Sequence, residues 1–332
     1  MTPSYDAELN LLYIGTSVTS PAPKYMLAGN DHEYLYHNST LALDGNTGEI
    51  KWYYQHVVDH WDLDHPFERI LLDTAVAPDP SQVAWINPKV RPGERRKVIT
   101  GVPGKTGIVY TLDLKTGEFL WATPTVLQTV ISSIDGATGK VQVNPEMLFT
   151  KRGDTKFVCP NANGGKNYQA GAYSPQTNTM YMPLQNTCAE MTSVLDKPTL
   201  DSLYGVNAKA VIATGTDKVG TIQAINAQTG ATTWKFEQRA GTGSVIATGG
   251  GLLFAGDAAG RFRALDQTNG RVLWETNLGA PVTGFPATYT VGTRQYVAVS
   301  TGSALASGGT SRLTPELRPA NANNLFVFAL PN

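Results

Sequence analysis

The stretch between Trp52 and Glu68 holds the densest cluster of chemically versatile side chains in the chain. It reads Trp52-Tyr-Tyr-Gln-His-Val-Val-Asp-His-Trp-Asp-Leu-Asp-His-Pro-Phe-Glu68 and contains three of the five histidines and two of the six tryptophans. Its aspartates, Asp59, Asp62 and Asp64, alternate with large apolar side chains. Burying a carboxylate is costly unless it meets a cation, a metal ion or hydrogen-bond donors. The stretch is therefore either a solvated loop or a site.

All five histidines of the chain fall in one short region: His32, His37, His56, His60 and His65. A histidine metal site is one interpretation of this clustering. The sequence contains no HxxH or HExxH spacing, however, which is the arrangement that places two histidines on one metal ion. His60 and His65 are therefore predicted to be supporting or loop residues.

The elements that would position this stretch come from a repeated pattern. An apolar strand is followed by Asp/Asn-x-x-Thr/Asn-Gly-x-x-x-Trp at residues 44–52, 113–121, 226–234 and 266–274, with a weaker copy at 135–139 that lacks the tryptophan. Each copy predicts a β-hairpin, because the Asp begins a turn, the Gly supplies a positive φ and apolar alternation resumes beyond it. The tryptophan is predicted to pack on the neighbouring repeat.

The spacing of the repeats indicates a β-propeller. Gly230 and Gly270 lie 40 residues apart, which is the length of a four-stranded blade. The interval from Gly48 to Gly117 fits one blade with an insertion, and that from Gly117 to Gly230 is predicted to hold two blades with insertions. We predict an all-β fold of four to five blades forming one domain over residues 1–332, with a β-sandwich as the structural alternative.

Composition excludes several classes of function. The net charge of −1 gives no electrostatic footprint for nucleic acid, and no apolar run approaches the ~18 residues of a membrane span. The first residues show no signal-peptide pattern. Cys159 and Cys188 are 29 positions apart and not in a CxxC or CxxCH pattern, so a disulfide across a loop and two buried thiols are both compatible with the sequence.

Taken together, the repeats, the cysteine pair and Trp61-Asp-Leu-Asp64 resemble the quinoprotein alcohol dehydrogenases. These are eight-bladed propellers that carry pyrroloquinoline quinone (PQQ) and a metal ion. Their Ala-x-Asp-x-x-Thr-Gly-x-x-x-Trp docking repeat is matched by residues 42–52. The resemblance runs from residue 4 to residue 330 and implies the C-terminal part of a longer family member, an incomplete set of about five four-stranded blades. It also implies a periplasmic location.

The resemblance assigns roles to both aspartates of this segment. The family has a His-Asp-x-Trp-Asp segment soon after a docking tryptophan, and its last Asp is the proposed catalytic base and a metal neighbour. Here that position is Asp62. Members that use lanthanides carry a second Asp two residues later, which Asp64 matches, so calcium or a lanthanide ion is the expected metal. The alternative for both aspartates is a solvated turn.

Cofactor contacts follow from the same resemblance. Lys105, in Gly104-Lys-Thr-Gly107, matches the Lys or Arg that donates to the quinone oxygens of PQQ. Asn167 matches a PQQ-contacting asparagine, and Tyr168 stands where tryptophan is common. The local alternatives are a surface-turn lysine and a loop asparagine. The family's cysteine pairing implies a disulfide between Cys159 and Cys188.

The chain also departs from the family pattern. The family's metal-ligating asparagine lies in Gly-x-Gly-Asn-Pro-Ala-Pro, whereas residues 15–23 here contain no Asn. Ser17, Thr19, Ser20 or a backbone carbonyl would replace it, unless that ligand is absent. The resemblance places the PQQ-stacking tryptophan, the metal-ligating glutamate and a disulfide ring upstream of residue 1, so this chain alone is expected to bind PQQ weakly.

The implied function is oxidation of a primary or secondary alcohol to an aldehyde or ketone by hydride transfer to PQQ, with Asp62 as the base. Because the chain has no CxxCH, electrons are expected to leave to a separate acceptor, a cytochrome c. Two alternatives stay open. One is a non-catalytic periplasmic scaffold that binds protein partners and has no reason to keep Asp62, Lys105 and Asn167 together. The other is an inactive fragment.

Overall fold

Two compact units make up the chain. The computed structural model describes residues 3–18, 22–58, 61–199, 204–303 and 311–329. Unit 1 comprises Met1–Asn167, Thr187–Ala213 and Gln228–Ala231, and unit 2 comprises Tyr168–Asn186, Thr214–Ala227 and Thr232–Asn332. The regular structure is almost entirely antiparallel strand, as predicted, with short 3-10 turns at η1 (Lys24–Met26) and η2 (Pro145–Met147).

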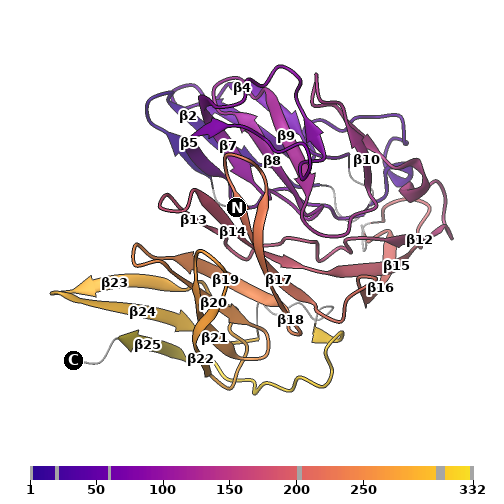
Figure 1. Ribbon diagram of the computed structural model, residues 1–332. Coiled ribbons are helices and arrows are strands. Elements are labelled where there is room, and N and C mark those ends of the chain that lie inside the picture. Colours follow the sequence, from indigo (N-terminus) through magenta and orange to yellow (C-terminus); the bar gives the residue numbers. More distant parts are fainter. Residues whose placement is uncertain (1–2, 19–21, 59–60, 200–203, 304–310, 330–332) are drawn as a thin grey trace. The chain divides into compact units, whose positions relative to one another are not determined.

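Unit 1 contains two blade-like sheets, in which neighbouring strands lie side by side (Figure 1). The first has the order β1-β2-β3-β4, and the second has the order β5-β7-β8-β9-β6. The strands are β1 (Ser4–Asp6), β2 (Leu11–Gly15), β3 (Ser39–Asp44), β4 (Ile50–Gln55), β5 (Ile70–Val76), β6 (Trp85–Ile86), β7 (Glu94–Gly101), β8 (Ile108–Asp113) and β9 (Phe119–Pro124). The Asp62 segment connects these two sheets, since it follows β4 and precedes β5.

Unit 1 also contains two smaller sheets that the repeats did not predict as separate elements. One pairs β10 (Ile131–Ile134) with β11 (Val141–Val143) through the turn of the weak repeat copy. The other has the order β12-β15-β16, formed by Thr155–Val158, Thr187–Ser193 and Val206–Ile212. The disulfide between Cys159 and Cys188 closes this region. It confirms the pairing that the family resemblance implied.

Unit 2 contains three sheets, of which the first two have four strands and the third has three. The orders are β13-β14-β17-β18, β19-β20-β21-β22 and β23-β24-β25. The strands are β13 (Ala172–Ser174), β14 (Thr179–Gln185), β17 (Gly220–Asn226), β18 (Thr232–Gln238), β19 (Thr242–Ala247), β20 (Leu252–Asp257), β21 (Arg261–Asp266), β22 (Val272–Asn277), β23 (Ala287–Val291), β24 (Arg294–Ser300) and β25 (Leu325–Ala329).

The predicted hairpin turns are present at the repeats. The amide of Gly48 donates to the Asp44 carbonyl at 2.8 Å, and that of Gly117 donates to Asp113 at 2.9 Å. These glycines have φ values of +75° and +74°. The carboxylates of Asp44 and Asp113 also accept backbone amide hydrogen bonds inside their own turns. The side chain of the Asp and the conformational freedom of the Gly therefore build each turn together.

The repeat tryptophans pack on the glycine of the next repeat. A Cβ atom on Gly117 would lie 2.6 Å from the ring of Trp52, and one on Gly270 would lie 2.6 Å from the ring of Trp234. Gly230 likewise faces Trp121, at 3.1 Å. Since no side chain other than hydrogen fits under these rings, the glycines serve both the turn and the packing between repeats.

The contact between Trp121 and Gly230 corrects one expectation from the repeat spacing. The interval from Gly117 to Gly230 was predicted to hold two blades with insertions. Trp121 instead packs directly on the next repeat glycine, so the interval is filled by the two small sheets and the strands that lead to β17. The chain therefore forms five blade-like sheets, of which three have four strands, one has five and the last has three.

Candidate functional site

Strand-like alternation in the loop after β4 places two carboxylates on one side. Trp61, Leu63 and His65 are fully buried. Asp62 and Asp64, which alternate with them, keep side-chain exposures of 17% and 18%. Because successive side chains of an extended segment point to opposite faces, the apolar anchors direct both carboxylates the same way. The loop is thus fixed by its buried face and presents its acids on the other.

Lys105 lies between the two carboxylates. Its Nζ is 2.7 Å from Asp62 Oδ1 and 2.7 Å from Asp64 Oδ2, and its side chain is buried. Its backbone amide also donates to the Asp64 carbonyl at 2.9 Å. Both interactions span more than forty residues of sequence. The structure therefore brings Lys105 together with both aspartates.

The electrostatics of this trio differ between its two acids. Burial raises the pKa of Asp62 to about 7, aided by neighbouring Asp64 and opposed by Lys105. Burial acts on Asp64 in the same direction, but hydrogen bonds from Asp62, Lys105 and Ser17 outweigh it and lower the pKa of Asp64. The two carboxylates raise the pKa of Lys105 despite its burial. Asp62 is thereby suited to exchange a proton near neutral pH, while Asp64 stays ionised.

Asp62 also has an unusual backbone. Its φ is +136°, a conformation that L residues with a side chain rarely adopt. Such strain persists only where surrounding structure holds the segment, and it is common at functional sites. Here the flanking Trp61 and Leu63 supply that restraint through their burial.

Of the residues predicted to replace the family's asparagine, the structure places Ser17 at the site. The Ser17 hydroxyl donates to Asp64 Oδ1. Thr19 and Ser20, the other two candidates, lie outside the described residues, as do Asp59 and His60. Ser17 therefore adds a hydroxyl oxygen to the two carboxylates.

The histidines form part of the support beneath the loop. His56 and His65 are both buried and stack with their ring centroids 5.0 Å apart. His65 is within hydrogen-bond distance of the Leu63 carbonyl at 2.6 Å and of the Thr106 hydroxyl at 3.1 Å. Burial lowers the pKa of His65 to about 3, so its ring is neutral. Its supporting role matches the prediction for this residue.

Sequence reasoning missed Arg69, which braces the same loop from inside the protein. Its guanidinium donates to the carbonyls of His65 at 2.8 Å and Phe67 at 2.7 Å, and to the Thr40 hydroxyl at 2.8 Å. The residue is buried. Arg69 lies outside the repeated hairpin motifs, so the sequence does not indicate this role.

A second missed contact fixes the loop that carries Asn167. Lys166 is fully buried, and its Nζ lies 2.8 Å from Glu68 Oε1. The amide of Gly165 donates to the Lys105 carbonyl at 2.8 Å. The loop is therefore attached both to the end of the aspartate segment and to the lysine turn.

Asn167 itself is partly buried and donates to the Asn163 carbonyl at 2.9 Å within its own loop. The loop begins at the disulfide, where the side-chain amide of Asn161 donates to the Cys188 carbonyl at 3.2 Å. Tyr168, the other predicted cofactor contact, belongs to unit 2, where it packs edge-on against Phe285. Unit 1 thus holds Asp62, Asp64, Lys105 and Asn167, and Tyr168 lies in the other unit.

Comparison with protein families identifies two segments. Residues 1–128 match the family described as "Glucose/ethanol/alcohol dehydrogenase, beta-propeller domain", and residues 200–312 match "Outer membrane protein assembly factor BamB". Lupanine 17-hydroxylase (cytochrome c) from Pseudomonas sp is 30% identical over 336 residues, which cover 98% of this chain and 45% of that protein. The lanthanide-dependent methanol dehydrogenase of Methylacidiphilum fumariolicum (strain SolV) is 32% identical over 307 residues, or 90% and 47%.

The comparison with solved structures agrees with these sequence matches. A europium-containing methanol dehydrogenase superposes with a TM-score of 0.85 at 28% identity, covering 99% of this chain and 58% of that one. The chain belongs to the PQQ-dependent alcohol dehydrogenase family. Its fold is accordingly that of the quinoprotein β-propellers. The chain spans less than half the length of the two curated relatives named above.

The side chains gathered at this site fit the groups that the family implies, in part. Asp62, Asp64 and Ser17 offer oxygen atoms only, the donor type that calcium and lanthanide ions prefer. Across the described residues, however, no group of three or more His, Cys, Asp or Glu side chains is arranged to hold a metal ion. The oxygen-bearing side chains that the structure brings together here are two carboxylates and one hydroxyl. No helix within the described ranges is long and apolar enough to cross a membrane.

Proposed function

We propose that this chain takes part in oxidising a primary or secondary alcohol to the corresponding aldehyde or ketone, with PQQ as the electron acceptor. The observation that carries the proposal is the buried trio of Asp62, Lys105 and Asp64. A non-catalytic scaffold has no need for two partly buried carboxylates around one buried lysine. Relatives named as quinone-dependent alcohol dehydrogenases support the same conclusion.

Asp62 is the proton acceptor in this proposal. Burial raises the pKa of its carboxyl to about 7, so the ionised form is a stronger base than an exposed aspartate and is still populated at neutral pH. Asp62 accepts the hydroxyl proton of the alcohol. Asp64, held ionised by Ser17 and Lys105, keeps the local field negative and opposes loss of the positive charge on Lys105.

Two groups from outside the chain complete the proposal. Asp62, Asp64 and Ser17 would hold a calcium or lanthanide ion, and Lys105 with Asn167 would hold PQQ. When bound, PQQ supplies the acceptor for the hydride of the carbinol carbon, and the ion supplies Lewis acidity. Tyr168 is the remaining proposed contact of the cofactor. We further propose that the whole chain acts as one propeller domain, in the periplasm, and passes electrons to a cytochrome c.

The test uses the full chain loaded with PQQ and either Ca²⁺ or La³⁺, with an artificial dye as electron acceptor and a panel of primary and secondary alcohols. Asp62→Asn should lower kcat at least about 100-fold, since general-base catalysis contributes about 10²- to 10⁴-fold. Binding of PQQ, followed by fluorescence quenching, should persist in the variant. That second readout separates loss of the base from loss of the cofactor.

The matched control is Asp73→Asn, which changes an exposed aspartate on β5 that pairs with Arg95 at the surface. This control should keep wild-type turnover. Full activity of Asp62→Asn would remove Asp62 from the mechanism. Absence of any PQQ binding by the wild-type chain would instead favour the scaffold or the inactive fragment.

A further inference from the structure

One face of the last sheet of unit 2, β23-β24-β25, is apolar and exposed. The strand register puts Val297, Val299 and Phe328 on the face that packs on the preceding sheet. The opposite face, which we call the last-sheet face, consists of Ala287, Tyr289, Val291, Tyr296, Ala298, Leu325 and Val327. Leu325 is 71% exposed and Val291 is 61% exposed. The three strands contain one charged residue, Arg294, which lies over the ring of Tyr296.

The first sheet of unit 1, β1-β2-β3-β4, has a face of the same kind. Its register puts Tyr13, Ala42 and Trp52 on the side of the unit 1 core. The opposite side, which we call the first-sheet face, consists of Tyr5, Leu12, Ile14, Leu41, Leu43, Ile50 and Tyr53. Tyr5, Ile50 and Tyr53 are exposed large side chains. None of the seven residues is charged, so this face is also apolar.

The turn of the first repeat lacks the contact made by the later repeat glycines. Gly117, Gly230 and Gly270 each lie against a tryptophan from the repeat before them. At Gly48, a Cβ atom would meet nothing within 4 Å. Since this turn position faces the preceding sheet in the later repeats, the equivalent position at Gly48 belongs to the first-sheet face. A side chain from another molecule can approach it.

The sheet between the two ends of unit 2 shows what covers such faces. One side of β19-β20-β21-β22 packs on β13-β14-β17-β18 through Leu253 and Ala255. The other side packs on β23-β24-β25 through Phe254 and Phe262. Each contact is an apolar sheet face laid on another apolar sheet face. The last-sheet face is of the type that receives a following sheet, and the first-sheet face is of the type that receives a preceding one.

A single chain therefore carries both halves of one such contact. Burial of apolar surface favours association, and an exposed apolar patch of this kind commonly marks a protein interface. No unpaired carboxylate or ammonium group stands on either face to oppose close packing. The partner that offers a matching face of the same packing type is a second copy of the chain.

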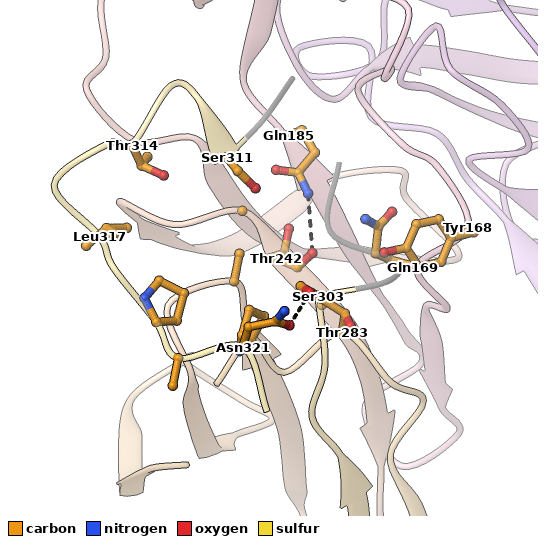
Figure 2. Close-up of a pocket in the computed structure, with 16 residues that line it drawn as sticks. Tyr168, Gln169, Gln185, Thr242, Thr283, Ser303, Ser311, Thr314, Leu317 and Asn321 are labelled. Carbon is orange, nitrogen blue, oxygen red and sulfur yellow. Dashed lines mark hydrogen bonds between the residues drawn. The ribbon is translucent and has the colours of Figure 1, made fainter. Parts of the chain in front are cut away.

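Both faces are separate from the cavity of about 160 Å³ in unit 2 (Figure 2). That cavity is lined in part by Tyr168, a proposed contact of the cofactor, so it is assigned to the proposed site. None of the described residues that line it belongs to β23, β24 or β25 or to the first sheet. Association through the two faces would therefore leave the cavity lining unchanged.

We propose that the last-sheet face of one copy of this chain packs on the first-sheet face of a second copy. Because two different faces meet, the contact is heterologous, or head-to-tail. The inference goes beyond the proposed function, since it requires no PQQ, metal ion or turnover. Its failure would leave the proposed oxidation untouched, and failure of the oxidation would leave this interface untouched.

Sedimentation velocity of the full chain without cofactor tests the proposal. The wild type should associate increasingly as its concentration is raised through the micromolar range. Val327→Lys places a charge on the last-sheet face, and Ile50→Lys places one on the first-sheet face. Each should weaken association at least about 30-fold, because an unpaired charge would be buried in an apolar contact. Phe157→Lys, at an exposed apolar position on β12 outside both faces, is the matched control and should associate as the wild type does.

Mixing the two variants tests the head-to-tail arrangement. The Ile50→Lys chain keeps an intact last-sheet face, and the Val327→Lys chain keeps an intact first-sheet face. Each should be monomeric alone, whereas an equimolar mixture should form dimers with one copy of each and nothing larger. Circular dichroism verifies that both variants are folded, and recovery of association on mixing is a result that misfolded chains would not give.

Four results would overturn the proposal. A wild type that stays monomeric would do so, and its sedimentation with uncharged phosphatidylcholine vesicles would then identify lipid as the occupant of the faces. Undiminished association of Ile50→Lys alone would show that the last-sheet face pairs with itself. A mixture of the two variants that stays monomeric would exclude contact between the two faces. Loss of association in Phe157→Lys would place the interface elsewhere.

Discussion

At the scale of single residues, the negatively charged groups of the site outnumber its positively charged group. Lys105 provides one positive charge against two carboxylates, Asp62 and Asp64, at 2.7 Å from each. With both acids ionised the trio carries a net charge of −1. Ser17 adds a hydroxyl oxygen at Asp64. A cluster of oxygen donors with residual negative charge in a partly buried place favours association with a cation.

This balance predicts that Asp64 affects which metal ion the chain prefers. Attraction between a carboxylate and an ion scales with the charge of the ion, so a 3+ ion gains more from Asp64 than a 2+ ion does. Asp64→Asn should therefore weaken La³⁺ binding about 30-fold and Ca²⁺ binding about tenfold. Competition against Tb³⁺, whose luminescence the neighbouring Trp61 can sensitise, measures both affinities without turnover.

Asp73→Asn serves again as the control, because its carboxylate is exposed and paired with Arg95. It should change neither affinity. Equal losses for the two ions in Asp64→Asn would show that this carboxylate does not select between them. An unchanged affinity for both would exclude Asp64 from the set of ligands.

The hydrogen bonds of Arg69 are predicted to stabilise the fold and to hold the site loop in place. Its three hydrogen bonds hold the carbonyls of His65 and Phe67 and the Thr40 hydroxyl in the interior. Arg69→Met keeps much of the side-chain volume but leaves these acceptors unpaired, so the free energy of unfolding should fall by about 2–3 kcal/mol. Urea unfolding measures the loss. Arg95→Met, at an exposed position, should stay within about 0.5 kcal/mol of the wild type.

Metal binding by the Arg69→Met variant tests the effect of Arg69 on the site itself, which the unfolding measurement does not. Because Arg69 contacts the segment directly after Asp64, a folded Arg69→Met protein should also bind Tb³⁺ more weakly. A variant that is destabilised but binds Tb³⁺ with unchanged affinity would reduce Arg69 to a purely structural residue.

At the scale of elements, the contact between a tryptophan and the next repeat glycine can be separated from the turn that the glycine forms. Gly48 and Gly117 occupy equivalent turn positions with φ of +75° and +74°. A Cβ at Gly117 would lie 2.6 Å from the Trp52 ring, whereas a Cβ at Gly48 would meet nothing within 4 Å. The two positions share the backbone cost of a side chain and differ only in packing.

Gly48→Ala should therefore lower the free energy of unfolding by about 1–2 kcal/mol, the cost of an L residue in the left-handed region. Gly117→Ala should lose a further 1–3 kcal/mol or so through overpacking against Trp52. Chemical denaturation of the two variants gives the difference directly. Equal losses would show that Trp52 moves aside freely and that the docking contact contributes little.

The elements that sequence predicted well are those with local signals. Each Asp…Gly…Trp repeat fixes its own turn through contacts three or four residues apart, so the hairpins were predictable from short windows. The prediction of two blades between Gly117 and Gly230 was wrong, because an insertion of small sheets occupies a similar length of sequence to a pair of blades. Only the packing of Trp121 on Gly230 distinguishes them.

The residues of the candidate site also differ in how well the sequence predicts them. Asp62, Asp64, Lys105 and Asn167 were proposed from motif resemblance, and the structure gathers the first three by direct contact. The bond from Ser17 to Asp64 spans 47 residues, and that from Lys166 to Glu68 spans 98. Such pairs leave no periodic trace in a sequence, because either partner alone resembles an ordinary loop residue.

At the scale of the whole molecule, two buried histidines are predicted to influence how the stability of the fold depends on pH. His56 and His65 are buried and stacked on each other beneath the aspartates. Burial lowers the pKa of His56 well below its usual value, and the neighbouring His65 and Arg69 lower it further. When the chain unfolds, both rings return to a pKa of about 6.5. The unfolded state therefore binds more protons than the folded state below that pH.

The sign of the resulting pH dependence is fixed by linkage. The two buried histidines should make stability fall as the pH decreases below about 6.5, by up to about 1.4 kcal/mol per pH unit each. Asp62, whose pKa burial raises to about 7, acts in the opposite direction, because its folded form takes up a proton that the unfolded form does not bind until near pH 4. Urea unfolding between pH 7 and pH 5, with EDTA to remove metal ions, measures this slope. His56→Gln, which keeps a polar side chain near the Thr40 hydroxyl, should reduce the slope by about half of the histidine contribution. His32→Gln, at an exposed position, should leave it unchanged. A His56→Gln slope equal to that of the wild type would mean that carboxylates, and not the buried histidine pair, set the acid limit of the fold.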